Sequence, residues 1–183
     1  MLQAGAVFYD SHGTILDEFE ANLQEIEGAV PDPKTMEWWA LQEKSKPGTW
    51  TNMRKNLVSA EVAMSRFTNK VININKKLNA SPVMVCYPAG YDFTYFYWYL
   101  CKFTGKSCLG FSCIDMKTLG ANLIQSSYRE SAKRNYPKKW FDPKLKHTHG
   151  ALDDAKEQGH LFWSMVNEME NQWAILNASK TSV

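Results

Sequence analysis

The sequence predicts a mixed α/β fold in which one sheet is covered by helices on its faces. Short strand patterns alternate with helix patterns along the chain, in the order β-β-α-α-β-α-β-α-α. The 183 residues suit one compact domain, and 44% apolar side chains supply a sizeable core. We expect a single domain over residues 1–178 and a frayed Ser/Thr/Lys tail over residues 179–183.

Composition and charge narrow the class of protein. No segment approaches the roughly 18 consecutive apolar residues that a membrane span needs, so we expect no membrane partner. The net charge is only +2. The basic stretch from Arg129 to His147 is either a solvated loop or a contact for phosphates. The cysteines lack zinc-site spacing and the N-terminus lacks a signal-peptide pattern, which together favour a cytoplasmic location.

A β-hairpin is predicted at the start of the chain. The apolar segment Leu2–Tyr9 is followed by the turn Asp10–Gly13 and by a second strand pattern at Thr14–Phe19. The first strand is apolar on both faces. We therefore expect it to lie centrally in the sheet and to be covered on both sides.

Two helix signals follow the hairpin. Pro31-Asp32-Pro33 opens a helix that ends near Lys46-Pro47-Gly48, and Ser59 caps a longer helix. Several apolar residues of the longer helix recur at helical spacing and should face the core. They are Val62, Phe67, Val71, Ile74 and Leu78.

Strands and helices alternate in the second half of the chain. A short buried strand is predicted at residues 83–87, an aromatic helix at 92–103, a further strand at 109–114, and a helix capped by Asp115 at 116–124. The aromatic helix should bury Phe96, Tyr99, Leu100 and Phe103. The long last helix shows one apolar stripe, which consists of Leu152, Ala155, Gly159, Phe162, Val166, Met169 and Trp173.

Three polar residues stand at the ends of predicted elements. Asp92 begins the aromatic helix, His149 precedes the last helix, and Asp154 lies one turn inside it. Each has an ordinary structural alternative: a helix cap, a surface-loop residue, or a charge that complements the helix dipole. If they gather at one rim of the sheet, the carboxylates could hold a divalent cation and the histidine could accept a proton from water.

The segment His149–Ala155 has the pattern H-x-A-L-x-D-A, and it resembles the last motif of the DEDDh family of 3'-5' exonucleases. Gly90-Tyr91-Asp92-Phe93 is similar to the family's middle motif. Ala4–Asp10 and Gly13–Leu16 look like its second and third strands. Trp38-Trp39-x-x-Gln42 resembles a helix of small bacterial and phage exoribonucleases. The family is the ribonuclease T-like branch of the RNase H-like fold.

The resemblance implies a two-metal phosphodiester hydrolase that acts on single-stranded RNA or DNA 3' ends, with RNA favoured. Asp154 and Asp92 would ligate Mg²⁺ or Mn²⁺, and His149 would be the general base. His147 is excluded because Leu152 stands five residues after it. Homodimers also occur among the relatives. Candidate contacts to the nucleic acid are Trp38, Trp39, Gln42, Tyr91, Phe93, Lys138 and Lys139.

The sequence departs from the family in one motif. The first strand of the family, which carries Asp-x-Glu, is missing, and neither Asp10 nor Asp17-Glu18 can replace it because both follow the second strand. We favour a sequence that begins too late over a degenerate relative or a sheet completed by another chain. The 183 residues should then be weakly active or inactive. The alternatives are a catalytically dead nucleic-acid-binding or partner-binding module and an unrelated α/β domain with chance spacing.

Overall fold

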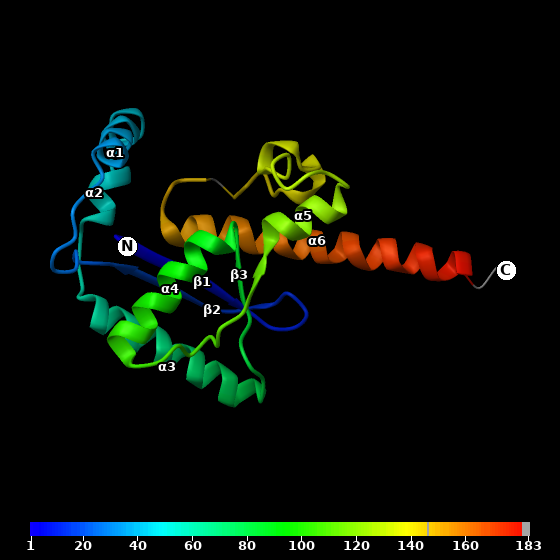
Figure 1. The fold of residues 1–183 in the computed structure, drawn as a ribbon, viewed down its shortest axis with the longest axis horizontal. Coiled ribbons are helices and arrows are strands. Elements are labelled where there is room, and N and C mark those ends of the chain that lie inside the picture. Colours follow the sequence, from blue (N-terminus) through cyan, green and yellow to red (C-terminus); the bar gives the residue numbers. More distant parts are fainter. Residues whose placement is uncertain (146, 181–183) are drawn as a thin grey trace.

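The computed structural model describes residues 1–145 and 147–180, with side chains as far as residue 177. The fold is mixed α/β, as predicted (Figure 1). Two short 3-10 turns, Lys133–Asn135 and Lys138–Trp140, lie in the long loop before the last helix. The strands and helices are β1 Gln3–Tyr9, β2 Ile15–Asn22, α1 Pro33–Ser45, α2 Thr49–Met53, α3 Ala60–Leu78, β3 Met84–Cys86, α4 Ala89–Thr104, β4 Cys113–Asp115, α5 Met116–Leu123 and α6 Ala151–Lys180.

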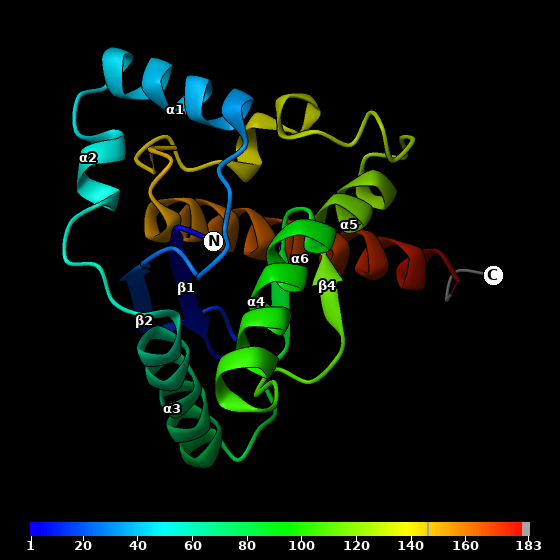
Figure 2. The same cartoon turned by 60° about the vertical axis from the view of Figure 1, so that its left-hand side comes forward.

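The four strands form two separate sheets, so the prediction of one continuous sheet is wrong for the described residues. β1 and β2 make the predicted antiparallel hairpin, whereas β3 and β4 pair with each other in parallel (Figure 2). β3 and β4 contain three residues each, fewer than the predicted segments. A period-2 apolar pattern identifies a strand, but it does not specify which edges meet.

Helices cover both faces of β1, as its apolar sequence predicts. Ala4 contributes to a core shared with α3 and α4, whereas Gly5 and Tyr9, on the opposite face, approach Ala151 and Gly159 of α6. Ala4 is nevertheless the only residue of β1 that is fully buried. The strand is therefore covered by helices but not enclosed.

One edge of β1 has no strand beside it among the described residues. The hydrogen bond from Leu23 N–H to the Leu2 carbonyl places Leu2 in a hydrogen-bonded pair, so the pairs at Ala4, Ala6 and Phe8 also face β2. The backbone groups of the residues between them point to the other edge. Among the described residues β1 is therefore an edge strand of a two-stranded sheet, and the prediction that it lies centrally in a sheet is wrong for them.

Side chains of α3 and α4 form most of the first core. Phe67 and Val71 are buried as predicted, but Val62 is 47% exposed and Leu78 is 41% exposed. The buried face of α3 instead runs through Ala60, Ala63, Met64, Phe67 and Val71. Small residues at this face suit the close packing of α3 against α4, whereas the predicted face contained large side chains alone. In α4 the predicted core residues Phe96, Tyr99 and Leu100 are buried, and Phe103 is partly buried.

The second core joins α6 to α5 and to the long loop. Leu161 and Met165 of α6 pack with Met116, Tyr136 and Trp140. Beyond this contact α6 projects from the body of the molecule (Figure 1), and Trp173 is 59% exposed. The predicted apolar stripe is therefore wrong in two respects. It omits Leu161 and Met165, the fully buried residues of the described part of the helix, and its C-terminal end extends beyond the surface against which the helix packs.

The end of α6 also differs from the prediction. The helix continues through Lys180, so residues 179 and 180 belong to it rather than to a frayed tail. Residues 181–183 of the predicted tail lie outside the described residues. In the part of the chain that the structure describes, none of the helices combines the length and apolar character needed to cross a membrane.

Candidate active site

Asp92 lies in the first turn of α4, because that helix begins three residues earlier than predicted. The capping alternative for Asp92 is therefore wrong. Asp115 performs that role and accepts hydrogen bonds from the backbone N–H groups of Ala89 (3.0 Å) and Thr118 (3.1 Å). Asp92 is left as a partly buried carboxylate in the first turn of α4, without a capping function.

The start of α6 is fixed against β1, which positions Asp154. Gln3 of β1 accepts a hydrogen bond from the first backbone N–H of the helix, that of Ala151, at 2.8 Å. Directly beside it, an added Cβ on Gly5 would lie 2.3 Å from the carbonyl carbon of Ala151. The helix thus begins in direct backbone contact with the strand, which only a glycine permits.

Four polar side chains meet at this helix start. His147 Nδ1 lies 3.1 Å from Asp154 Oδ1 and 3.0 Å from Glu157 Oε2. The imidazole rings of His147 and His149 are 4.5 Å apart, and His149 adopts a left-handed φ of 65°. The motif spacing excludes His147 as the general base, and Glu157 is not among the residues predicted from the sequence. Glu157 is three residues after Asp154 and so shares its helix face, which is the signal that could have identified it.

Burial raises the pKa values of both aspartates. The pKa of Asp92 rises to about 6, first because of burial and then because of the negative charge of Asp154. The pKa of Asp154 is also raised by burial, although His147 and His149 oppose this. The charge of Asp154 therefore reaches Asp92, and the joint site of the two aspartates stays a prediction.

The His149 imidazole is held in its neutral form. Its pKa is lowered from the ordinary histidine value by burial and by the neighbouring His147. A neutral imidazole has a free lone pair, so it can accept a proton near neutral pH. Lys133, which the sequence analysis did not single out, adds positive charge: its Nζ lies 3.1 Å from Glu157 Oε1.

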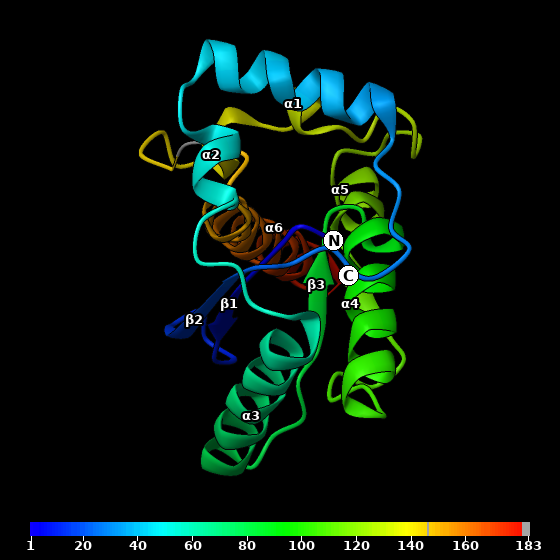
Figure 3. The same ribbon diagram turned by 90° about the vertical axis from the view of Figure 1, so that its left-hand side faces the viewer.

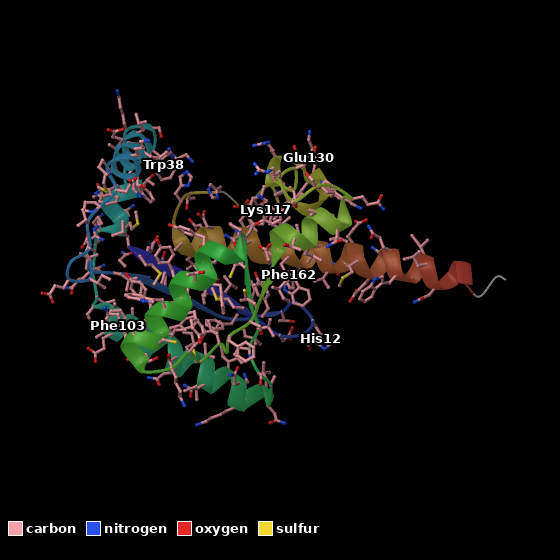
Figure 4. The ribbon with its side chains drawn as sticks, viewed as in Figure 1. His12, Trp38, Phe103, Lys117, Glu130 and Phe162 are labelled. Carbon is pink, nitrogen blue, oxygen red and sulfur yellow. The ribbon has the colours of Figure 1, made fainter. Side chains whose placement is uncertain are left out.

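An aromatic wall faces the histidines. The ring of Trp38 lies edge-on to that of His149 with centroids 4.9 Å apart, and Trp39 lies at 6.5 Å. Figure 3 shows α1 and α2 on the side of α6 opposite the hairpin, and Figure 4 places Trp38 near the start of α6. Glu43 fastens α2 to α1 because it accepts hydrogen bonds from the Gly48 and Trp50 backbone N–H groups. These bonds and others lower its pKa to about 2.

The other predicted contacts to nucleic acid have neighbours of their own in the structure. Tyr91 is 63% exposed beside Tyr95, and the Phe93 ring packs near Tyr97 at 5.6 Å. Lys139 pairs with Glu168 at 2.6 Å. Glu168 follows Asp154 by 14 residues, which is about 21 Å along a helix. Lys138 is exposed in the same turn as Lys139, and Gln42 is half-buried on α1.

The carboxylates fit one hard cation better than two. Asp154 Oδ1 is buried and receives no hydrogen bond from the described residues, because the His147 contact lacks hydrogen-bond geometry. Such an oxygen can serve as a metal ligand. The group of described ligand atoms that lie within 4.8 Å of one another contains His147, His149 and Asp154, and it does not include Asp92. Both oxygens of Glu157 are already engaged, by Lys133 and by His147. Two divalent cations would therefore lack ligands and compensating charge.

We expect Asp92→Asn to stabilise the folded protein at pH 8 in the presence of a chelator. A folded-state pKa of about 6, above the ordinary 3.8, means that the stabilising proton is bound at low pH and lost as the pH rises through 6. A rise of the pKa from 3.8 to about 6 corresponds to about 3 kcal/mol of lost stability at high pH. Because Asp92 is partly accessible to solvent, we expect the substitution to raise the free energy of unfolding by about 2 kcal/mol. Urea unfolding at pH 4 and pH 8 measures the difference.

Asp153, the exposed neighbour of Asp154, provides the control for that experiment. Asp153→Asn changes the same formal charge at an exposed position and should alter the free energy of unfolding by less than about 0.5 kcal/mol. Equal stability of Asp92→Asn and wild type at pH 8 would contradict the raised pKa.

Comparison with known proteins leaves this geometry as the main guide to function. No protein-family model matches the sequence, and no curated protein gives a significant match. The assignment of function therefore depends on the residues and on their arrangement.

Proposed function

We propose that this chain is a metal-dependent 3'-5' exonuclease of the DEDDh type with an RNase H-like fold, and that it acts on single-stranded 3' ends, RNA in preference to DNA. One observation carries the proposal. His149 and Asp154, the pair with the motif spacing, lie together at the start of α6, and the charge of Asp154 contributes to the raised pKa of Asp92 of the middle motif.

The residues suit hydrolysis by an activated water molecule. A divalent cation held by Asp154 and Asp92 would supply positive charge that acidifies a water molecule and stabilises the negative charge of the phosphate. His149, which is neutral because burial lowers its pKa, can take the proton of that water. The Lys133 ammonium group lies on the same side of α6, where it favours the approach of a phosphate.

The aromatic wall suits a single-stranded end. Trp38 is 40% exposed and lies against His149, so a base stacked on its free face would bring the adjoining phosphate towards the histidine. Stacking on tryptophan tolerates every base, which agrees with a nuclease of low sequence preference. An enzyme that removes successive nucleotides must bind every base, so its contacts cannot be specific to one of them.

The alternative is a nucleic-acid-binding module without catalysis. It is favoured by the small number of unengaged carboxylates, since Glu157 is paired and only Asp92 and Asp154 are available for a cation. For the same reason we expect the cleavage rate of these 183 residues to be low. Weak cleavage and tight binding would then occur together.

The test is an assay with 5'-labelled single-stranded RNA in Mn²⁺, in Mg²⁺ and in a chelator, with binding of the same RNA measured in parallel. We expect a ladder of products shortened from the 3' end in Mn²⁺, none in the chelator, and no cleavage of circular RNA. Binding without cleavage would support the alternative. Neither binding nor cleavage would reject both.

A further inference from the structure

We propose that His147, His149 and Asp154 form a site for one divalent transition-metal ion, with Zn²⁺ as the expected occupant. The ligand atoms of these three residues all lie within 4.8 Å of one another. This site is distinct from the pair Asp92–Asp154 because it includes two imidazole nitrogens, one of them from a histidine that the exonuclease pattern leaves without a role.

The distances are close to those that a shared ion imposes. Ligand atoms at about 2.1 Å from one tetrahedral ion lie about 3.4 Å apart. His147 Nδ1 is 3.1 Å from Asp154 Oδ1 and 3.0 Å from Glu157 Oε2. An ion at this point would take the place of the His147 ring proton and lie within reach of both carboxylates. His149 would need to move only slightly, and it belongs to a non-helical segment.

The buried oxygen of Asp154 points to a cation independently of this spacing. Asp154 Oδ1 has no accessible surface and no hydrogen bond from the described residues. Burial of a carboxylate oxygen without a donor is unfavourable, and a metal ion relieves it directly. Lys133 Nζ lies 3.1 Å from the other oxygen of Glu157. This ion pair holds the Glu157 carboxylate beside His147, as residues around a metal site orient its ligands.

The donor set determines the kind of metal. Imidazole nitrogen binds Zn²⁺, Co²⁺ and Ni²⁺ well, whereas Mg²⁺ prefers oxygen ligands and retains its water. Two imidazoles with one or two carboxylates are a typical zinc donor set. If the proposed exonuclease function holds, an ion here would occupy both His149 and Asp154, so Zn²⁺ would inhibit the reaction that Mn²⁺ supports.

The experiment titrates the metal-stripped full chain with Zn²⁺ against a chromophoric zinc indicator, and with Co²⁺ while its visible d–d absorption is recorded. We expect one ion per chain, no competition from a large excess of Mg²⁺, and at least about 10-fold weaker binding in His147→Ala. His12→Ala removes an exposed histidine from the hairpin turn and should bind Zn²⁺ like wild type.

Two results would overturn the site. A thiolate-to-Co²⁺ charge-transfer band would place the ion on the free cysteines instead, and equal Zn²⁺ affinity of wild type and His147→Ala would remove the histidine cluster as the ligand. Neither result depends on catalysis. A chain that binds Zn²⁺ through His147 but does not cleave RNA would retain this site and lose only the proposed exonuclease function.

Discussion

Asp154→Asn should lower the metal-dependent cleavage rate by on the order of 100-fold or more, the loss expected when a principal electrostatic contact in the transition state is removed. The substitution keeps the size of the side chain but removes the charge that a cation requires. It should not unfold the protein, because burial already makes the charged form of this carboxylate unfavourable. His149→Ala should cause a loss of roughly 100-fold or more, because it removes the general base.

Each variant has a matched control in the same chain. Asp153→Asn alters the adjacent, exposed carboxylate of α6, and His12→Ala alters a histidine in the hairpin turn. Both should cleave RNA at nearly the wild-type rate. Initial rates with 5'-labelled RNA in Mn²⁺ give the comparison, and circular dichroism verifies the fold. If Asp153→Asn lost as much activity as Asp154→Asn, the assignment of the metal ligand would be wrong.

Gly5→Ala should destabilise the protein by about 3 kcal/mol, a typical cost of forcing extra volume into a packed site. The new methyl group would meet the carbonyl carbon of Ala151 at 2.3 Å and the backbone nitrogen of Leu152 at 2.4 Å. Both are backbone atoms of α6 and cannot rotate away. The start of the helix must therefore move, and Asp154 with it, so the Zn²⁺ affinity should fall together with the midpoint of urea unfolding.

Gly90→Ala is the control with the opposite expected sign. Gly90 lies in the first turn of α4, and no atom stands within 4 Å of a Cβ added there. Alanine is favoured over glycine in a helix by roughly 0.5–1 kcal/mol, so this variant should be as stable as wild type or more so. A Gly5→Ala protein as stable as Gly90→Ala would show that β1 and α6 are not in the contact described above.

The local sequence predicted the elements of this fold well. The turn Asp10–Gly13 between two apolar segments predicted the hairpin, and Asp32, Ser59 and Asp115 were recognisable helix caps whose side chains accept the expected backbone N–H groups. The short helix α2 was missed because its five residues carry no apolar repeat. Such signals span a few residues, so they can be recognised without knowledge of the rest of the chain.

The candidate site was only partly visible in the sequence. The spacing of His149 and Asp154 singled them out, and Asp92 was found at the turn after a strand. His147 was rejected on the same spacing rule, yet its ring contacts both Asp154 and Glu157. A rule based on sequence distance cannot identify residues that meet because a loop folds back over a helix.

Contacts between segments that are far apart in the sequence decided the rest of the fold and of the candidate site. The side-chain oxygen of Gln3 accepts a hydrogen bond from the Ala151 backbone N–H at the start of α6, 148 residues away in the sequence, and the contact of Trp38 with His149 joins α1 to the last loop. The division into two sheets and the exposure of Trp173 likewise depend on which surfaces meet and how far they extend. The sequence by itself determined the elements, their caps and the His149–Asp154 pair, because these follow from local periodicity and local hydrogen bonding. Only the tertiary structure decided the pairing of edges and the composition of the site, because these depend on contacts between segments that no local pattern relates.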